Sequence, residues 1–302
     1  MDFTGYFVDS VELEVYSPSH YKGFRVLSYR HSFHAGNFAD VLKHIVLVEA
    51  LEHLLRKDSA FDYIDTHGGA GVFNLHSSHA QKLGEFREGV GKLKSADFPE
   101  LANYFEVISA FNTSPKLQTY PGSPAIASYL MRGHDKGWAY ELHPKDFELL
   151  ADIMARQRNF SVYQEDGFEG LLARVPPASR RGLALIDPSF EVKSEYEKVV
   201  TTIAKAYSKF STGTYALWYP VVDRETNVRL EKKIIASGVK NVQLFELSVA
   251  ADSKGSGMTA AGMIVVNPPW QLFAKMTALL PKLGQAIAPD SASFRCEVLV
   301  KE

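Results

Sequence analysis

The sequence predicts an α/β fold in which a mostly parallel sheet carries helices on both of its faces. Seven short runs rich in β-branched and aromatic residues have the length and composition of buried strands. Segments of helical length lie between most of them, and this alternation is typical of strand-helix-strand units. We therefore predict a seven-stranded sheet with strands at 61–67, 137–143, 160–166, 182–188, 214–221, 242–249 and 262–269.

The clearest helical pattern covers 39–57, where apolar residues recur with a period close to that of an α-helix. Similar patterns cover 145–157 and 194–210. Residues 77–118 hold two more helix-like patterns, the first of which covers 78–94. We expect this region to form a small helical insertion subdomain beside the main sheet.

Composition excludes several classes of protein. The chain has 302 residues, 46% of them hydrophobic, which suffices for one large core or two domains. A formal charge of −2 excludes a uniformly basic coat for nucleic acid. The single cysteine, Cys296, excludes a disulfide framework and a thiolate-rich zinc site. No apolar run approaches the roughly 18 residues of a membrane span, and no secretory signal is evident, so we expect a cytoplasmic protein.

Ligands of such sheets bind at the carboxyl ends of the strands. The first strand ends in DTHGGAG, where Asp65 precedes Gly69 and Gly71. A glycine loop of this kind lets the backbone approach a ligand closely, but the three-glycine dinucleotide fingerprint is incomplete. The pattern suits S-adenosylmethionine, which has no pyrophosphate, better than NAD. An ordinary glycine turn is the alternative.

Acids also follow the next two strands. Glu141 is placed to accept hydrogen bonds from a ribose diol, and Asp166 with the Gly167 amide could bind an adenine ring. Ser123, in the tight loop YPGSP, could donate to a ligand. The structural alternatives are a solvated glutamate, a helix N-cap at Asp166 and a plain turn.

The fourth strand ends in Asp187-Pro188-Ser189-Phe190. The exocyclic amine of adenine is a poor nucleophile because its lone pair is conjugated with the ring. Two acceptors, the Asp187 carboxylate and the Pro188 carbonyl, could hold its two hydrogens and turn the lone pair toward a methyl donor. Phe190 could stack on the base. The alternative is a turn between strand and helix with a buried phenylalanine.

Eight blocks of the chain, together with Asp-Pro-Ser-Phe, resemble the bacterial 23S ribosomal RNA adenine-N6 methyltransferase J family. The resemblance runs from Leu27 to the C-terminus. It implies a Rossmann-like class I fold that depends on S-adenosylmethionine, with a helical insertion. The blocks are 27–47, 65–71, 120–127, 141–147, 165–168, 180–191, 215–222 and 257–270.

The resemblance also implies residue roles. Asp187 would be the catalytic residue, with Pro188 and Phe190 beside it, and Tyr29 and Phe190 would contact the target base. No metal is implied. The cofactor would be held by Lys43, His44, His67, Ser123, Glu141, Asp166, Gly167 and Asp187.

The implied substrate is one adenine of 23S ribosomal RNA, flipped out of its stem, in RNA that is free of proteins or in an early precursor. Residues 17–37, which interleave basic and aromatic side chains, suit contact with RNA. We expect a monomer with no membrane partner.

Two features depart from the family pattern. Ser189 and Phe190 replace a proline and a tyrosine, so we expect a looser loop and a slower but active enzyme. An extension, residues 1–26, precedes the methyltransferase domain at 27–302, and Val26 occupies the usual position of the initiator methionine. We hypothesise that translation starts at Val26 and that residues 1–25 are a gene-model artefact.

Three rival functions stay open. The first is methylation of adenine in DNA or another RNA, although a sizeable target-recognition domain is not evident. The second is an NAD-dependent oxidoreductase, which the incomplete glycine fingerprint disfavours. The third is an RNA-binding protein with weakened catalysis, for which Ser189 is the only support.

Overall fold

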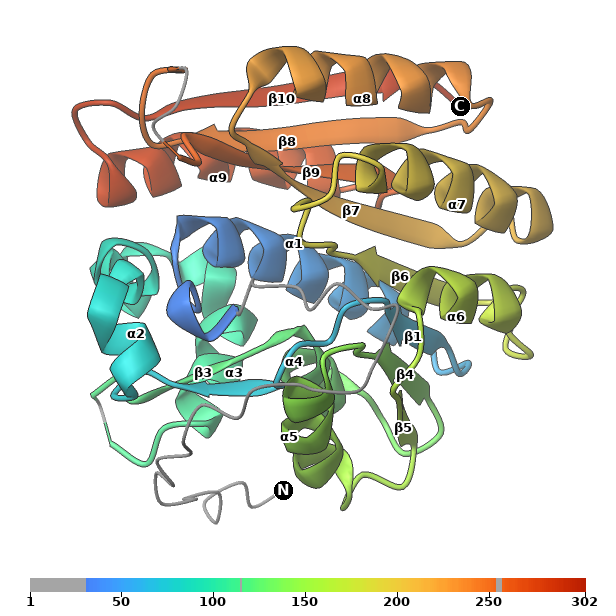
Figure 1. Ribbon diagram of the computed structural model, residues 1–302, viewed down its shortest axis with the longest axis horizontal. Helices are drawn as coiled ribbons and strands as arrows, with labels where there is room; N and C mark the ends of the chain where they lie inside the picture. The colour runs from blue at the N-terminus through green and yellow to red at the C-terminus, as the bar shows by residue number, and fades with distance from the viewer. Residues whose placement is uncertain (1–30, 115, 254–256) are drawn as a thin grey trace, which may run out of the picture.

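The computed structural model describes residues 31–114, 116–253 and 257–302. Its main body is an eight-stranded sheet in the order β10-β8-β9-β7-β6-β1-β4-β5, with helices on both faces (Figure 1). The predicted α/β fold is therefore confirmed. The strands of this sheet are β1 Asp62–Asp65, β4 Lys136–Tyr140, β5 Phe160–Tyr163, β6 Gly182–Ile186, β7 Thr214–Val221, β8 Val242–Ser248, β9 Ala260–Val266 and β10 Ser293–Val300.

The parallel strands of the sheet determine where a ligand-binding crevice can form. Strands β7, β6, β1, β4 and β5 run parallel, whereas β9 is antiparallel to both β7 and β8. Strands β6 and β9 are buried along their whole length, as expected of strands covered on both faces. The chain moves outward from β1 through β4 to β5 and then returns to β6, directly beside β1. This reversal creates a crevice at the carboxyl ends of β1 and β6.

The predicted number of strands was wrong by one. The eighth strand, β10, pairs antiparallel with β8 at the edge of the sheet. Its side chains are exposed or only half-buried, and Arg295 and Glu297 interrupt its apolar residues. An edge strand of this kind lacks the continuous apolar run that marks the buried strands.

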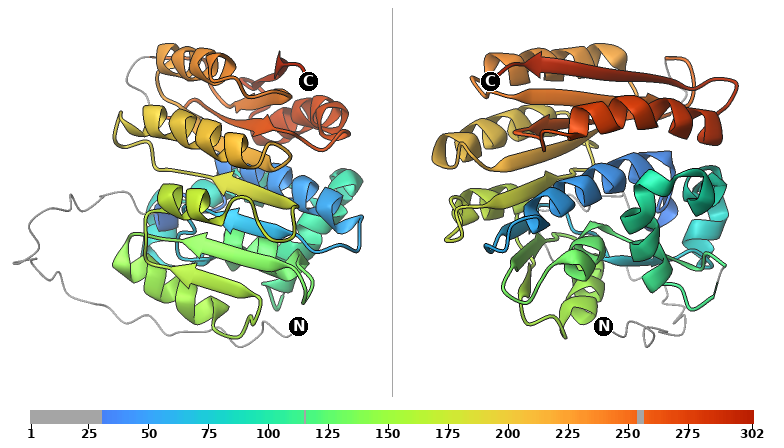
Figure 2. Two further views of the ribbon diagram at one scale, coloured as in Figure 1. Left: turned by 90° about the vertical axis from the view of Figure 1, so that its right-hand side faces the viewer. Right: turned by 180° about the vertical axis from the view of Figure 1, so that it is seen from behind.

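Two hydrophobic cores lie on opposite faces of the sheet (Figures 1 and 2). One contains side chains of α1 Phe38–Leu55, α4 Ser123–Leu130, α5 Pro144–Met154 and α9 Leu272–Ile287. The other contains side chains of α6 Gly167–Arg174, α7 Glu195–Lys209 and α8 Arg224–Ala236. The helices expected at 39–57, 145–157 and 194–210 are confirmed as α1, α5 and α7, with ends that differ by at most three residues.

Residues between β2 and β3 pack against α1 and share its hydrophobic core. Strands β2 Val72–Asn74 and β3 Thr119–Pro121 pair antiparallel where this segment leaves and rejoins the rest of the fold. The pattern over 78–94 is not one helix, because Gly84 takes a left-handed conformation with φ 64° and ends α2. The Val90 amide donates to the Gly36 carbonyl at 2.9 Å, which holds this segment at the N-terminus of α1. The short helices are η1 His31–Phe33, α2 Ser78–Leu83, η2 Glu85–Glu88, η3 Val90–Lys92, η4 Ser95–Asp97, η5 Pro99–Leu101 and α3 Ala102–Ala110.

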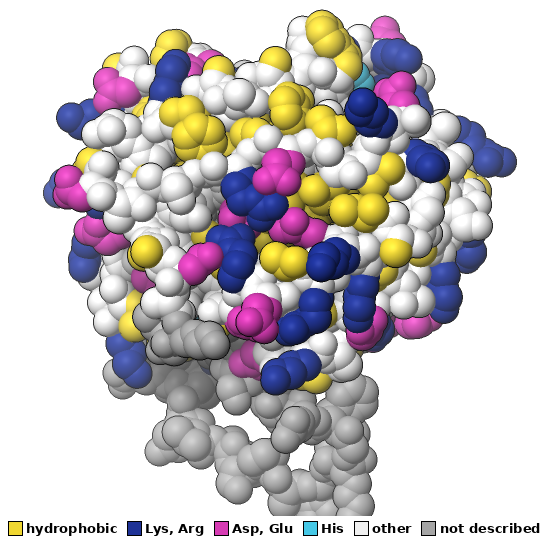
Figure 3. All heavy atoms as spheres, turned by 90° about the horizontal axis from the view of Figure 1, so that it is seen from above, with side chains coloured by type: hydrophobic (Ala, Val, Ile, Leu, Met, Phe, Trp, Pro, Cys, Tyr) yellow, Lys and Arg dark blue, Asp and Glu magenta, His cyan; other side chains and the backbone are white. Residues whose placement is uncertain are grey.

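The face over α8 and β10 carries interspersed acidic and basic side chains (Figure 3). Beneath it, the buried Glu246 carboxylate accepts from Arg224 at 2.7 Å and from the Tyr219 hydroxyl at 2.8 Å. Arg295 of β10 pairs with Glu231 of α8 at 2.9 Å and so fixes the edge strand. Within the described ranges, no helix is both long and apolar enough to cross a lipid bilayer.

Candidate active site

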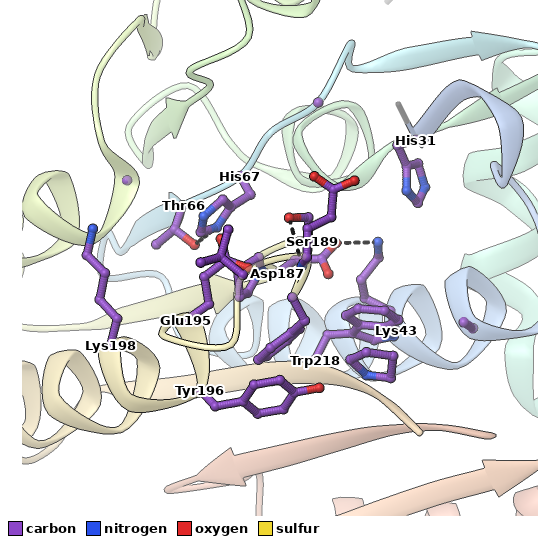
Figure 4. A pocket seen from close by; sticks show the side chains of 18 of the residues that line it. His31, Lys43, Thr66, His67, Asp187, Ser189, Glu195, Tyr196, Lys198 and Trp218 are labelled. Atoms are coloured by element: carbon purple, nitrogen blue, oxygen red, sulfur yellow. Dashed lines mark hydrogen bonds and ion pairs between the residues drawn. The ribbon is translucent and has the colours of Figure 1, made fainter. Parts of the chain in front are cut away.

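A cleft of about 1030 Å³ opens at the carboxyl ends of the parallel strands (Figure 4). It brings together side chains from α1, from the loop after β1, and from the ends of β4, β5 and β6. Tyr29 lies outside the described residues. Every other predicted site residue lines the cleft, namely Lys43, His44, His67, Ser123, Glu141, Asp166, Gly167, Asp187, Pro188 and Phe190.

A buried lysine connects α1 to the end of β6. Lys43 Nζ lies 2.6 Å from Asp187 Oδ2 and 2.8 Å from Asp40 Oδ1 (Figure 4). Asp40 Oδ2 in turn accepts from His31 Nε2 at 2.8 Å and from the Gly36 amide at 2.9 Å. These contacts form a continuous chain from the segment before α1 to the predicted catalytic carboxylate.

The charges of this chain are mutually stabilising. Burial alone would lower the pKa of Lys43, but attraction to Asp187 and Asp40 outweighs it and raises that pKa above its usual range. Burial likewise opposes ionisation of Asp40, yet His31 and Lys43 hold the pKa of Asp40 well below its usual range. At neutral pH, Lys43 is therefore a fixed cation and Asp40 a fixed anion.

The loop after β6 carries a strained aromatic residue. Phe190 has φ 55°, a left-handed conformation that is uncommon for a bulky side chain. Its ring centroid lies 4.4 Å from that of Tyr196 on α7 and 6.3 Å from that of Trp218 on β7. The Ser189 hydroxyl accepts a long hydrogen bond of 3.4 Å from the Glu191 amide. Ser189 and the Phe190 amide also interact with the Glu195 carboxylate, so Glu195 and the aromatic wall together support Phe190.

Glu141 supports the glycine loop from the neighbouring strand. Its carboxylate accepts from the Gly69 amide at 2.8 Å and from the His143 amide at 2.7 Å. Gly69 and Gly71 have φ of 58° and 77°, which explains why the loop needs glycine there. Burial outweighs the two amide bonds and raises the pKa of Glu141 to about 7.

Two neutral histidines flank the cleft. His44 is 1% exposed, and its Nδ1 lies 2.8 Å from the Tyr120 hydroxyl. Burial lowers the pKa of His44 to about 3, so the ring is neutral. Its buried Nε2 has no hydrogen-bond partner within the described residues. Burial also lowers the pKa of His67 to about 4, and its Nδ1 lies 2.7 Å from Thr66 Oγ1.

Asp166 and Ser123 have structural partners of their own. Asp166 caps α6 by accepting from the Phe168 amide at 2.9 Å, and its other oxygen accepts from Lys198 at 2.6 Å. Ser123, at the start of α4, is 5% exposed and interacts with the buried Asp65 carboxyl. The N-cap alternative for Asp166 is therefore realised, and a ligand would have to share this carboxylate with Lys198.

The cleft also contains side chains that were not predicted from the sequence, among them Asp40, Tyr196 and Trp218. A signal existed for Asp40, because it precedes Lys43 by three positions and lies on the same helical face. Trp218 offers a buried indole Nε1 that has no partner among the described residues. No local pattern marks Tyr196 or Trp218, since only the packing of β7 and α7 beside β6 brings them to Phe190.

A second segment, Asn267-Pro268-Pro269-Trp270, matches the Asp/Asn-Pro-Pro-aromatic signature more literally than residues 187–190. It follows β9, which runs antiparallel to β7, and so lies at the opposite edge of the sheet. The Asn267 side chain donates to the carbonyls of Ser211 and Gly213, both at 2.8 Å. Its amide thus closes a loop and is not available to a substrate.

Comparison with known proteins assigns the chain to a family. The profile of the family described as "Ribosomal RNA large subunit methyltransferase D, RlmJ" matches residues 58–300. A Haemophilus influenzae protein named "Ribosomal RNA large subunit methyltransferase J" is 46% identical over 281 residues, which are 92% of this chain and 100% of that protein. The Escherichia coli protein of the same name is 48% identical over 266 residues, which are 87% of this chain and 95% of that protein.

A solved structure agrees with these relatives. The crystal structure of a Legionella pneumophila protein superposes with a TM-score of 0.80 at 35% identity, covering 88% of this chain and 98% of that one. The superposition shows a shared fold, and the family profile and both relatives confirm the resemblance seen in the eight sequence blocks. The chain belongs to the ribosomal RNA large subunit methyltransferase J family.

Proposed function

We propose that this protein transfers a methyl group from S-adenosylmethionine to the exocyclic N6 of one adenine in 23S ribosomal RNA, and that the adenine is flipped out into the cleft. The observation that carries the proposal is the Asp187 carboxylate, held by Lys43 beside an aromatic wall. The names of both curated relatives support ribosomal RNA as the substrate. The choice of adenine N6 rests on Asp187-Pro188 and on the stacking surface of Phe190.

The cleft has features that suit S-adenosylmethionine. The Nε2 of His44 is a buried polar atom with no partner among residues 31–114, 116–253 and 257–302, and a ligand carboxylate or amine would satisfy it. The start of α6 lies directly against the end of β1, because Gly167 has no side chain. A Cβ at this position would lie 1.8 Å from the Thr66 carbonyl oxygen, so only glycine fits there. Glu141 offers a carboxylate for a ribose diol. The proposed set is completed by Lys43, His67, Ser123, Asp166 and Asp187.

The chain's own residues contribute positioning and electrostatics. S-adenosylmethionine, when bound, supplies a methyl group on a positively charged sulfur. The Asp187 carboxylate and the Pro188 carbonyl would accept the two N6 hydrogens and direct the lone pair. Phe190 would stack on the base, with Tyr196 and Trp218 behind it. Lys43 would hold Asp187 in one orientation while the base enters.

The wider setting is part of the same proposal. We expect a monomer that acts in the bacterial cytoplasm on RNA free of proteins or in an early precursor. An adenine within a stem must leave its stack to reach Asp187, and flipping costs a few kcal/mol. The predicted role of Tyr29 at the target base stays a prediction, because that residue lies outside the described ranges.

The function is tested by incubating the protein with radiolabelled S-adenosylmethionine and protein-free large-subunit RNA from cells that lack the enzyme. We expect label in a single N6-methyladenosine. Asp187→Ala should reduce the rate by at least about 100-fold, because a group that acts in the transition state is lost. Asp290→Ala, an exposed acid remote from the cleft, is the matched control. A rate for Asp187→Ala within a few-fold of that control would contradict the assignment.

Asp40 is predicted to matter through Lys43. Asp40→Asn keeps the shape of the side chain but removes one of the two carboxylates that hold the ammonium. We expect the single-turnover rate at saturating RNA to fall by roughly 10- to 100-fold, the worth of a hydrogen bond to a charged group. Cofactor affinity, measured by calorimetry, distinguishes a positioning effect from a collapsed site. An unchanged rate would show that Asp187 alone suffices to hold Lys43.

Cofactor affinity should depend on pH through Glu141. Its folded-state pKa of about 7 lies above its ordinary value, so the folded protein without ligand retains a proton that the unfolded chain releases near pH 4.5. Accepting two ribose hydroxyls favours the ionised form, so binding near neutrality releases this proton. We expect about tenfold tighter binding at about pH 8 than at about pH 6. Calorimetry in buffers of different ionisation enthalpy measures the proton, and Glu141→Gln should abolish both effects.

A further inference from the structure

The edge of the sheet opposite the cleft carries an exposed aromatic side chain. Trp270 is 73% exposed, whereas other exposed large hydrophobic side chains in the described ranges are at most 51% exposed. It lies between β9 and α9, at the end of the sheet opposite the cleft because β9 runs antiparallel to β7. A single exposed hydrophobic residue is ordinary, so its surroundings decide whether it has a function.

Cations gather around this tryptophan at the end of α1. Arg56 donates to Gln271, the neighbour of Trp270, at 2.8 Å. Arg181 donates to the Leu54 carbonyl at 2.6 Å. Arg132 donates to the carbonyl of the exposed Lys57 at 2.9 Å. We call Arg56, Lys57, Arg132, Arg181 and Trp270 the α1–α9 edge patch.

The positive charge of this patch is only partly compensated. Arg132 pairs with Asp135 at 2.9 Å and reaches Asp58 at 3.9 Å. Arg56 and Arg181 donate instead to neutral oxygens. The density of positive charge also affects His53 of α1. Its pKa is lowered, first by burial and then by repulsion from the nearby Arg56, Lys57 and Arg181. An excess of cations remains at this edge, in contrast to the mixed charges over α8 and β10 (Figure 3).

We propose that the α1–α9 edge patch binds single-stranded RNA of the substrate outside the target site, with a base stacked on Trp270 and phosphates at Arg56 and Lys57. An exposed aromatic ring beside uncompensated cations is the combination that single-stranded nucleic acid requires. The inference rests on the proposed RNA substrate and assigns a second contact surface to it. Acidic partners would suit the cations but would leave the flat ring of Trp270 without a function.

The geometry sets where this RNA lies relative to the target base. Lys43, in the cleft, lies on α1, and Arg56, in the patch, is the C-cap residue of the same helix, so thirteen positions separate them by about 20 Å. A folded RNA is wide enough to contact the cleft and the patch at the same time. The patch therefore contacts RNA that is remote from the flipped base, and it should affect affinity rather than the chemical step.

The test uses Trp270→Ala and Lys57→Gln in the full chain. Both residues are exposed, so neither substitution removes core packing. Val228→Ala on α8 and Lys205→Gln on α7, also exposed, are the matched controls. Filter binding to protein-free large-subunit RNA over a salt series gives Kd and its salt dependence, and steady-state methylation gives kcat and KM.

We expect Trp270→Ala to raise Kd by about 5- to 100-fold, as for loss of one stacked base. Lys57→Gln should reduce the slope of log Kd against log salt by about one. KM should rise in both variants while kcat stays unchanged, and the controls should match the wild type.

An unchanged Kd for Trp270→Ala, or an unchanged salt slope for Lys57→Gln, would overturn the proposal. Dissociation of a wild-type dimer by Trp270→Ala in sedimentation experiments would also overturn it, because the patch would then be an interface between two copies. Failure of the proposed function is a separate result: wild-type protein would bind RNA without forming N6-methyladenosine.

Discussion

One buried ammonium group holds the candidate active-site cleft together. Lys43 has a side chain that is 5% exposed, and leaving such a charge unpaired would cost several kcal/mol. It is stabilised only if α1 carries Asp40 one turn earlier and if β6 delivers Asp187 to the same point. The position of α1 across the sheet and the path of the loop after β6 are therefore coupled. The same chain of contacts reaches His31 and so fixes where the segment before α1 meets the cleft.

Strain and aromatic packing complete this arrangement. Phe190 adopts a left-handed backbone conformation, which costs of the order of 1–3 kcal/mol and persists only where the surroundings impose it. Here Tyr196 and Trp218 impose it by packing against the ring. The Asp187 carboxylate and the ring of Phe190 are thus already in place in the protein without a ligand. Under the proposed function, preorganisation of this kind would account for methyl transfer without a dedicated acid or base.

Much of the site could be predicted because parallel strands end at one edge. Asp65 ends β1, whereas Glu141, Asp166 and Asp187 follow β4, β5 and β6, and a local sequence pattern identifies a strand end. Asp40 was missed because its significance depends on Asp187, which lies far away in the sequence and contacts Lys43 across the fold.

Two further differences have equally physical causes. The eighth strand, β10, was missed because an exposed edge strand needs no continuous apolar run. Asn267-Pro268-Pro269-Trp270 shows the opposite problem. This segment matches the signature literally but follows an antiparallel strand. The end of that strand points away from the cleft, so the segment does not contribute to the site.

The most direct measurement is an experimental structure of the protein with S-adenosylhomocysteine and an RNA that contains the target adenine. We predict a flipped adenine whose N6 lies within hydrogen-bond distance of the Asp187 carboxylate and the Pro188 carbonyl, with its ring against Phe190. We also predict that Lys43 still bridges Asp40 and Asp187 in that complex. An adenine bound with N6 away from Asp187, or a complex in which Lys43 has left Asp187, would refute the proposed role of the Lys43–Asp187 pair.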